Sequence, residues 1–109
     1  MVDAPIDITV EDLKQLRDSG ADIAVLDVRE GWELDICSLP GAVHIPLGEL
    51  PDRAGELPKV GKLVVMCHRG GRSLRATQWL RANGVSHAVN LAGGITAWAE
   101  RVEPGMAVY

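Results

Sequence analysis

The sequence predicts an α/β protein built on a mainly parallel sheet. Short apolar runs that suit buried strands alternate along the 109 residues with segments that have the apolar periodicity of helices. The strand-like runs are almost continuously apolar, as the interior strands of parallel sheets are. The chain shows no internal repeat, low-complexity run or linker, and its length suits one compact core, so we expect a single domain over residues 1–109.

The first helix is predicted over residues 9–20. Thr9 can cap this helix, and Asp12 occupies the acidic position of a capping box. The apolar run at residues 22–28 then predicts a buried strand that ends at Asp27.

The middle of the chain predicts two further strands with a short helical segment between them. Residues 41–46 form a short strand that Pro46 closes, and residues 48–55 suit a short helix or turn. The clearest strand of the chain covers residues 62–67 and ends at Cys67.

The last third predicts a helix over residues 72–84, a strand over 86–91 and a short helix over 95–101. In open parallel sheets, ligands bind at the carboxyl ends of the strands. Asp27 and Cys67 both end predicted strands, so we expect them to share one edge of the sheet.

Composition and charge exclude several classes of protein. With 47% hydrophobic and 24% charged residues, the chain resembles an ordinary globular protein. The N-terminal stretch lacks the basic and apolar regions of a secretory signal, and no run approaches the ~18 apolar residues of a membrane span. We therefore expect a cytoplasmic protein without a membrane partner, and a net charge of −4 argues against nucleic acid as a partner.

The distribution of charge is more informative than the total. Residues 1–56 hold 13 acids and 4 bases, whereas residues 57–99 hold 6 bases and no acid. The basic part contains Cys67, and this favours a local anion site, although solvated surface arginines would give the same count. The two cysteines, Cys37 and Cys67, are expected to be free thiols. No metal-ligand spacing is present, so neither a zinc site nor any other metal site is expected.

Cys67 lies between a predicted strand and the start of a predicted helix. The unpaired amides and partial positive charge of a helix N-terminus, with nearby arginines, can lower a thiol pKa from ~8.5 to ~3.5–7.5. Gly70 and Gly71 allow the loop to curl its amides inward, and Arg69 and Arg72 could bind an oxyanion with two hydrogen bonds each. A phosphatase-like thiol, a sulfur-transferring thiol, a metal ligand and an inert buried cysteine are the candidate interpretations.

Spacing separates the first two interpretations. A tyrosine-phosphatase loop has the pattern C-x5-R, which would place arginine at position 73. Here that position is Ser73, and Arg72 makes the loop one residue shorter. A tighter ring of amides suits one extra sulfur atom on Cys67 better than a tetrahedral phosphate.

Four motifs occur in one order along the chain: "LDVRE" (26–30), "PGAVHIP" (40–46), "CHRGGRS" (67–73) and "NLAGGITAW" (90–98). With them the chain resembles the single-domain rhodaneses, which are thiosulfate sulfurtransferases. The resemblance implies a central, mainly parallel five-stranded sheet flanked by helices on both faces. It also implies that the active loop of this family corresponds to residues 67–72.

The resemblance further implies a mechanism with two half-reactions. Cys67 would attack the sulfane sulfur of thiosulfate or of a persulfide donor, and a thiol or cyanide would then accept that sulfur from the cysteine persulfide. No cofactor is required. Asp27 and Arg29 would support the loop, and a structural salt bridge between them is at least as good an interpretation as a contact with the substrate. The substrate and persulfide cradle would comprise His68, Arg69, Gly70, Gly71, Arg72 and Ser73.

Other interpretations stay open at this stage. A low-turnover sulfur carrier or regulatory rhodanese domain is the first alternative, and a phosphatase or arsenate reductase is the second. The expected partners are a small anionic sulfur donor and its thiol or cyanide acceptor, with a sulfur-relay protein as a further candidate, and a monomer is the default for this size. Cys37 could be a resolving thiol for Cys67 or a packed small side chain. Glu33 fits the family pattern but could equally lie on a solvated face, and Arg75 is expected to be exposed.

Overall fold

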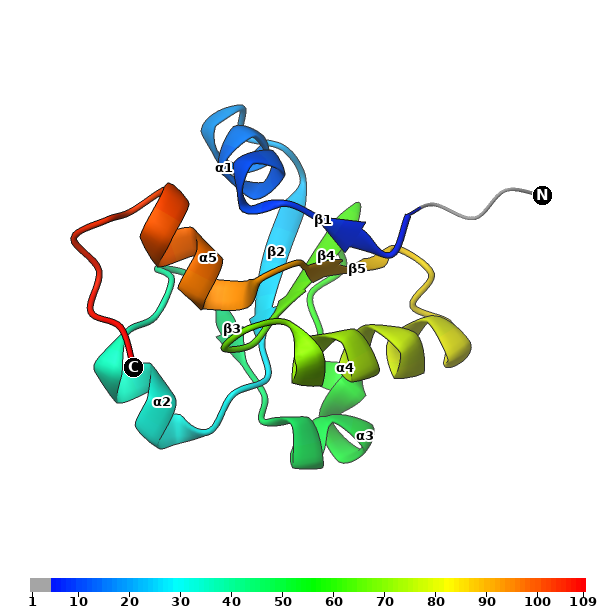
Figure 1. Ribbon diagram of the computed structural model, residues 1–109. Coiled ribbons are helices and arrows are strands. Elements are labelled where there is room, and N and C mark those ends of the chain that lie inside the picture. The colour runs from blue at the N-terminus through cyan, green and yellow to red at the C-terminus, as the bar shows by residue number, and fades with distance from the viewer. Residues whose placement is uncertain (1–4) are drawn as a thin grey trace.

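The computed structural model describes residues 5–109 and contains a five-stranded, wholly parallel sheet (Figure 1). The strand order is β1-β5-β4-β2-β3. The strands are β1 (Asp7–Ile8), β2 (Ile23–Asp27), β3 (Val43–His44), β4 (Lys62–Met66) and β5 (Ala88–Leu91). The helices are α1 (Val10–Asp18), α2 (Gly31–Ile36), α3 (Leu50–Arg53), α4 (Gly71–Ala82) and α5 (Gly94–Arg101), with 3-10 turns on both sides of α3. The predicted α/β fold is confirmed.

The helices cover both faces of the sheet, as Figure 1 shows. Side chains alternate along β4, so that Leu63 and Val65 face one side while Val64 and Met66 face the other. The first side packs against α3 and α4, and the second packs against α1 and α5. Cys67 continues the alternation of β4 and lies in the layer that α4 covers.

The loops that follow β2, β4 and β5 lie together at the carboxyl edge of the sheet. Asp27 pairs with Met66 in the register of β2 and β4, and Cys67 follows directly. Asp27 and Cys67 therefore share one edge, as expected. The chain leaves this edge from β2, β4 and β5 into α2, α4 and α5, respectively.

The capping box predicted for the first helix is present. The Thr9 hydroxyl accepts the Asp12 amide proton at 3.0 Å, and the Asp12 carboxylate accepts the Thr9 amide proton at 3.0 Å. None of the helices in the described part of the chain is long and apolar enough to cross a membrane. Residues 1–4, which belong to the stretch that predicts no secretory signal, lie outside the described residues.

Two elements were not predicted individually from the residues, β1 and α2. Strand β1 has only two residues and pairs with β5, which lies more than 80 residues further along the chain. Helix α2 has six residues, too few to show an apolar period. A capping box between Glu30 and Glu33 starts α2, and Arg29 binds the carbonyl groups at its end.

Candidate functional site

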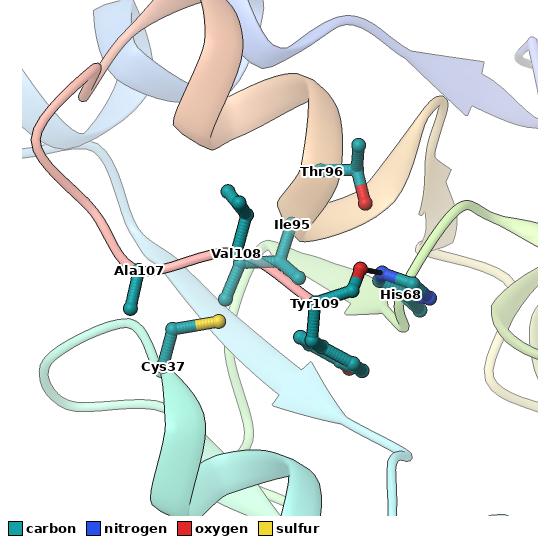
Figure 2. A pocket seen from close by; sticks show the side chains of 7 residues that line it. All are labelled: Cys37, His68, Ile95, Thr96, Ala107, Val108 and Tyr109. Carbon is teal, nitrogen blue, oxygen red and sulfur yellow. Dashed lines mark hydrogen bonds between the residues drawn. The ribbon is translucent and has the colours of Figure 1, made fainter.

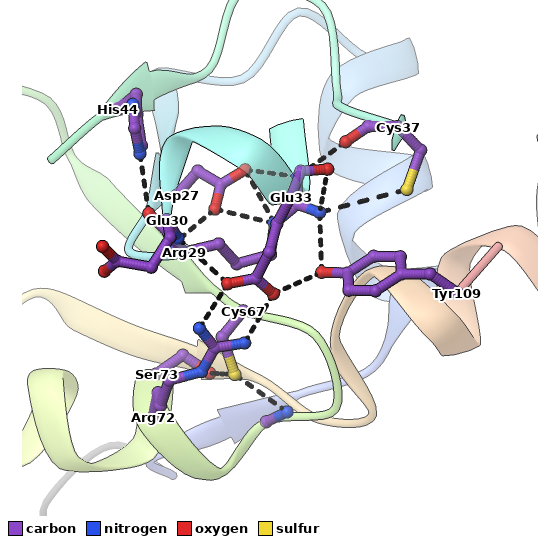
Figure 3. Close-up of polar contacts among 11 residues, drawn as sticks. Asp27, Arg29, Glu30, Glu33, Cys37, His44, Cys67, Arg72, Ser73 and Tyr109 are labelled. Carbon is purple, nitrogen blue, oxygen red and sulfur yellow. Dashed lines mark hydrogen bonds and ion pairs between the residues drawn. The ribbon is translucent and has the colours of Figure 1, made fainter. Parts of the chain in front are cut away.

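Cys67 lies at the start of the loop that connects β4 to α4, with its side chain directed into the loop (Figure 3). The residue is buried, with 1% of its surface exposed. Its Sγ accepts a hydrogen bond from the Gly70 amide at 3.1 Å and lies 3.2 Å from the Ser73 hydroxyl. Gly70 caps α4 with a φ of +108°, a backbone conformation that favours glycine.

The surroundings of Cys67 have opposing effects on its pKa. Burial raises the pKa of the thiol because it disfavours the thiolate. Hydrogen bonds from the Ser73 hydroxyl and from the amides of Ser73, Gly70 and Arg69 outweigh burial and bring the pKa below its ordinary value. The loop is therefore a ring of donors around one sulfur atom.

Helix α5 holds the same loop from its other side. The Cys67 carbonyl accepts the Ile95 amide proton at 3.0 Å, and the His68 carbonyl accepts the Thr96 amide proton at 3.1 Å. Gly94 has a φ of +59°, and a Cβ at this position would lie 2.5 Å from both carbonyl oxygens. Turn geometry and close packing therefore explain this glycine.

Arg72 does not extend freely into the loop. Its guanidinium makes two hydrogen bonds to the Glu33 carboxylate, at 2.6 and 2.8 Å (Figure 3). The Glu33 side chain is only 3% exposed, so the interpretation as a solvated face is wrong. These bonds from Arg72 lower the pKa of Glu33 to about 2, against the opposing effect of burial and with help from the Tyr109 hydroxyl.

The other two arginines of this region are exposed. The Arg69 side chain follows Cys67 by two residues, and among the residues that the structure describes its guanidinium has no hydrogen-bond or ion-pair partner. Arg75 lies on the solvent face of α4, as expected.

Asp27 and Arg29 form a fully buried salt bridge. Both side chains have no exposed surface, and Arg29 binds the Asp27 carboxylate at 2.8 Å, with further contacts at 3.0 and 3.2 Å. The remaining donors of Arg29 bind the Cys37 carbonyl at 2.8 Å and the Tyr109 hydroxyl at 3.0 Å. His44 lies 2.7 Å from the Arg29 carbonyl oxygen. The pair connects the end of β2 to the end of α2, which is the structural role that the sequence left open.

Tyr109 belongs to this region although no motif pointed to it. Its hydroxyl donates to Glu33 at 2.6 Å and accepts from Arg29 at 3.0 Å. Its ring stacks on the His68 ring with centroids 3.9 Å apart and planes 10° apart, and its backbone oxygen lies 2.8 Å from His68 Nε2 (Figure 2). Tyr109 is the single tyrosine of the chain, but no local pattern in the sequence connects it to the loop that carries Cys67.

Cys37 lies at the end of α2, apart from the layer that holds Cys67. Both cysteines are free, and Cys37 Sγ lies 3.9 Å from an Arg29 nitrogen. A crevice too narrow to hold water separates Cys37 from the C-terminal segment and His68 (Figure 2). Arg29 and Glu33 lie between the two thiols in Figure 3. Among residues 5–109, no three His, Cys, Asp or Glu side chains gather as metal ligands.

Comparison with known proteins identifies the family of this chain. A family model for the rhodanese-like domain matches residues 9–101. The chain belongs to this family. A protein of Allochromatium vinosum named as a sulfurtransferase is 34% identical over 98 residues, covering 90% of this chain and 92% of that protein. The structure titled as the human single domain sulfurtransferase TSTD1 has a TM-score of 0.77 and 31% identity, covering 90% of this chain and 98% of the human one.

Other relatives are longer than this chain. YrkF of Bacillus subtilis (strain 168), named as a sulfur carrier protein, is 37% identical over 97 residues, which are 89% of this chain and 52% of that protein. MoeZ of Mycobacterium tuberculosis (strain ATCC 25618 / H37Rv), named as an adenylyltransferase/sulfurtransferase, is 38% identical over 104 residues. The chain covers 26% of MoeZ, so it spans between about a quarter and half of the length of these two relatives.

Proposed function

We propose that this chain is a sulfurtransferase that carries sulfane sulfur as a persulfide on Cys67. The observation that carries the proposal is the ring of donors around Cys67 Sγ, with the Gly70 amide at 3.1 Å and the Ser73 hydroxyl at 3.2 Å, in a rhodanese-family chain. These donors favour the thiolate, which is the nucleophilic form of cysteine.

In the first half-reaction the Cys67 thiolate attacks the outer sulfur of thiosulfate or of another persulfide donor. A new S–S bond forms on Cys67, the donor's S–S bond breaks, and its electron pair leaves with sulfite or with a thiolate. The charge then resides on the outer sulfur of the cysteine persulfide. The loop amides stabilise this charge because they are fixed in place before it develops.

The charged residues of the loop divide this work. Arg69, which is exposed and unpaired among the described residues, attracts the anionic donor. Arg72 is bound to Glu33, so it contributes mainly by holding the loop against α2. The His68 ring stacks on the Tyr109 ring beside the loop, and Gly70 and Gly71 allow the turn into α4.

In the second half-reaction a thiophile attacks the outer sulfur and regenerates the thiolate. Cyanide, a small thiol or the thiol of a sulfur-relay protein would serve, and neither cofactor nor metal takes part in the proposed chemistry. The name of YrkF favours one alternative, a sulfur carrier that loads Cys67 but turns over slowly.

Mass spectrometry after treatment with thiosulfate tests the proposal. The wild-type protein should gain one sulfur atom, Cys67→Ser should gain none, and the matched variant Cys37→Ser should gain one. A sulfur atom on Cys67→Ser, or none on the wild type, would contradict the proposal. The steady-state rate of thiocyanate formation with excess thiosulfate and cyanide then separates a transferase from a carrier, because only a transferase reloads Cys67 and turns over many times.

A further inference from the structure

The Ser73 hydroxyl lies between two acceptors but has only one hydrogen to donate. Its Oγ is 3.2 Å from Cys67 Sγ and 2.5 Å from the Oδ1 atom of Asn90. All three residues are buried, with exposed fractions of 0% for Ser73, 1% for Cys67 and 4% for Asn90. Water therefore does not offer an alternative partner. Because Asn90 competes with Cys67 for this one hydrogen, Asn90 influences how well the Cys67 thiolate is stabilised.

Asp7 fixes the orientation of the Asn90 amide. Strand β1 pairs with β5 so that Asp7 lies opposite Asn90, and Asn90 Nδ2 donates to Asp7 Oδ1 at 3.0 Å. With its nitrogen turned to the carboxylate, the amide presents its oxygen to Ser73. A rotated amide would place its oxygen against the Asp7 carboxylate, which is unfavourable.

We propose that Asn90, oriented by Asp7, is a positioning residue that draws the Ser73 hydrogen away from Cys67. In the thiol form, the Cys67 S–H can donate to Ser73 while Ser73 donates to Asn90, and every group is satisfied. In the thiolate form, the Ser73 hydroxyl can donate a hydrogen bond to Cys67 Sγ only if it breaks its short hydrogen bond to Asn90. The competition makes the thiolate less stable than the loop donors alone would make it.

This inference rests on the proposed function and assigns the competition a role in it. A less stabilised thiolate is a stronger nucleophile toward the donor sulfur. Once the persulfide has formed, the negative charge lies on the outer sulfur, and Cys67 Sγ carries none. The Ser73 hydroxyl can then keep its hydrogen bond to Asn90 without leaving a charged Cys67 Sγ without that donor. The arrangement therefore favours the cysteine persulfide over the free thiolate.

Other charged and titratable groups surround Cys67 and stay in place in the variants below. They come from α2, α4, the end of β2, the loop itself and the C-terminal segment, and they are Glu33, Arg72, Asp27, Arg29, His68, Arg69 and Tyr109. These groups are the same in every variant, and Asp7→Asn separately measures the effect of removing the Asp7 charge.

The test is the pKa of Cys67, measured from the pH dependence of its alkylation by iodoacetamide. The mass of the peptide that contains Cys67 reports the reaction, so Cys37 does not interfere. Asn90→Leu keeps a similar volume without the acceptor, and it should lower the pKa by about one unit. The alkylation rate of the thiolate itself should fall about threefold, because nucleophilicity falls with pKa.

Asp7 supplies a matched pair of variants at an exposed position of an edge strand. Asp7→Ala frees the amide to rotate and donate to Ser73, so the pKa of Cys67 should fall. Asp7→Asn removes the charge but keeps an acceptor for Asn90, so the pKa should stay at the wild-type value. This pair also decides the outcome if Asn90→Leu fails to fold.

A Ser73→Ala background completes the design. Without the hydroxyl there is no hydrogen to compete for, so Asn90→Leu and Asp7→Ala should no longer change the pKa. An unchanged pKa in the two single variants, or a shift that persists in the Ser73→Ala background, would overturn the proposal. Alkylation requires no sulfur transfer, so this result can be distinguished from a failure of persulfide formation.

Discussion

Arg72 and Glu33 form an ion pair beside the loop that carries Cys67, and the two side chains differ in their exposure to solvent. The Arg72 side chain is 31% exposed, whereas Glu33 is 3% exposed and cannot rely on water. A carboxylate buried to this extent depends on its partners, and loss of the partner would leave a buried charge uncompensated and destabilise the fold. The pair therefore fixes the loop to α2 and balances the positive charge of Arg72.

The protonation of Glu33 should make stability depend on pH. Its pKa is lowered to about 2 from an ordinary 4.5, chiefly by Arg72, so the folded state gains stability above the ordinary pKa and loses it as the pH falls from 4.5 toward 2. Glu33→Gln should lower the free energy of unfolding by roughly 3 kcal/mol at pH 7. Urea unfolding at a series of pH values should show the gap between wild type and variant closing below pH 4.5.

A matched control for Glu33 is Glu11. Its side chain is 53% exposed and pairs with the equally exposed Arg101, so Glu11→Gln should change stability little at any pH. A gap for Glu33→Gln that stays constant with pH would show that the loss comes from packing rather than from the charge.

Helix α5 supports the loop that carries Cys67 through the backbone of its first turn rather than through a side chain. The amides of Ile95 and Thr96 donate to the carbonyls of Cys67 and His68, which fixes the backbone where the loop begins. The loop thus lies between the starts of α4 and α5. Close approach of α5 is possible only because Gly94 has no Cβ.

Alanine at Gly94 should therefore do more harm than alanine at Gly84. Both glycines have positive φ, +59° and +93°, and either alanine should cost about 1 kcal/mol for backbone strain alone. Gly84 has open space around it, whereas a Cβ at Gly94 meets two backbone oxygens at 2.5 Å. Gly94→Ala should lose at least about 3 kcal/mol of unfolding free energy and load sulfur poorly, as urea unfolding and persulfide mass would show. Equal losses for the two variants would mean that the loop moves without resistance.

The elements that the sequence predicts are those with local signals. Thr9 and Asp12 are three residues apart, and their capping box is visible without any knowledge of the fold. The interactions that sequence reasoning missed join distant positions. Glu33 meets Arg72 across 39 residues, and β1 needs β5 as its partner. The loop around Cys67 was readable because its chemistry lies within seven consecutive residues, whereas the contacts that support it are not consecutive.

At the scale of the whole molecule, the acidic first part of the chain and the basic second part meet at the site. Arg72 comes from the part with no acid, and Glu33 comes from the part with an excess of them. The C-terminal segment closes this junction, because Tyr109 contacts Glu33, Arg29 and His68 together. Three segments far apart in the sequence thus support one another around the loop.

Tyr109 offers a direct measure of this closure, since it is the chain's single tyrosine. Burial and the Glu33 carboxylate raise its pKa to about 12 from an ordinary 10, although Arg29 acts in the opposite direction. A raised pKa means that the contact stabilises the fold below pH 10 and that this stability is lost as the pH rises from 10 to 12. The ultraviolet absorbance of tyrosinate should therefore appear near pH 12 in the native protein and near pH 10 in urea.

Two variants show whether the contacts at Tyr109 cause this shift. Glu33→Gln removes the acceptor charge and should bring the midpoint of the tyrosinate titration down toward 10. Tyr109→Phe keeps the stacked ring but loses the hydroxyl, and it should lower the free energy of unfolding by about 1–2 kcal/mol at pH 7. A native titration near pH 10 would mean that the C-terminal segment does not rest on the loop in solution. Because the ring lies over His68, directly after Cys67, that result would also mean that the sulfur donor reaches the loop more easily.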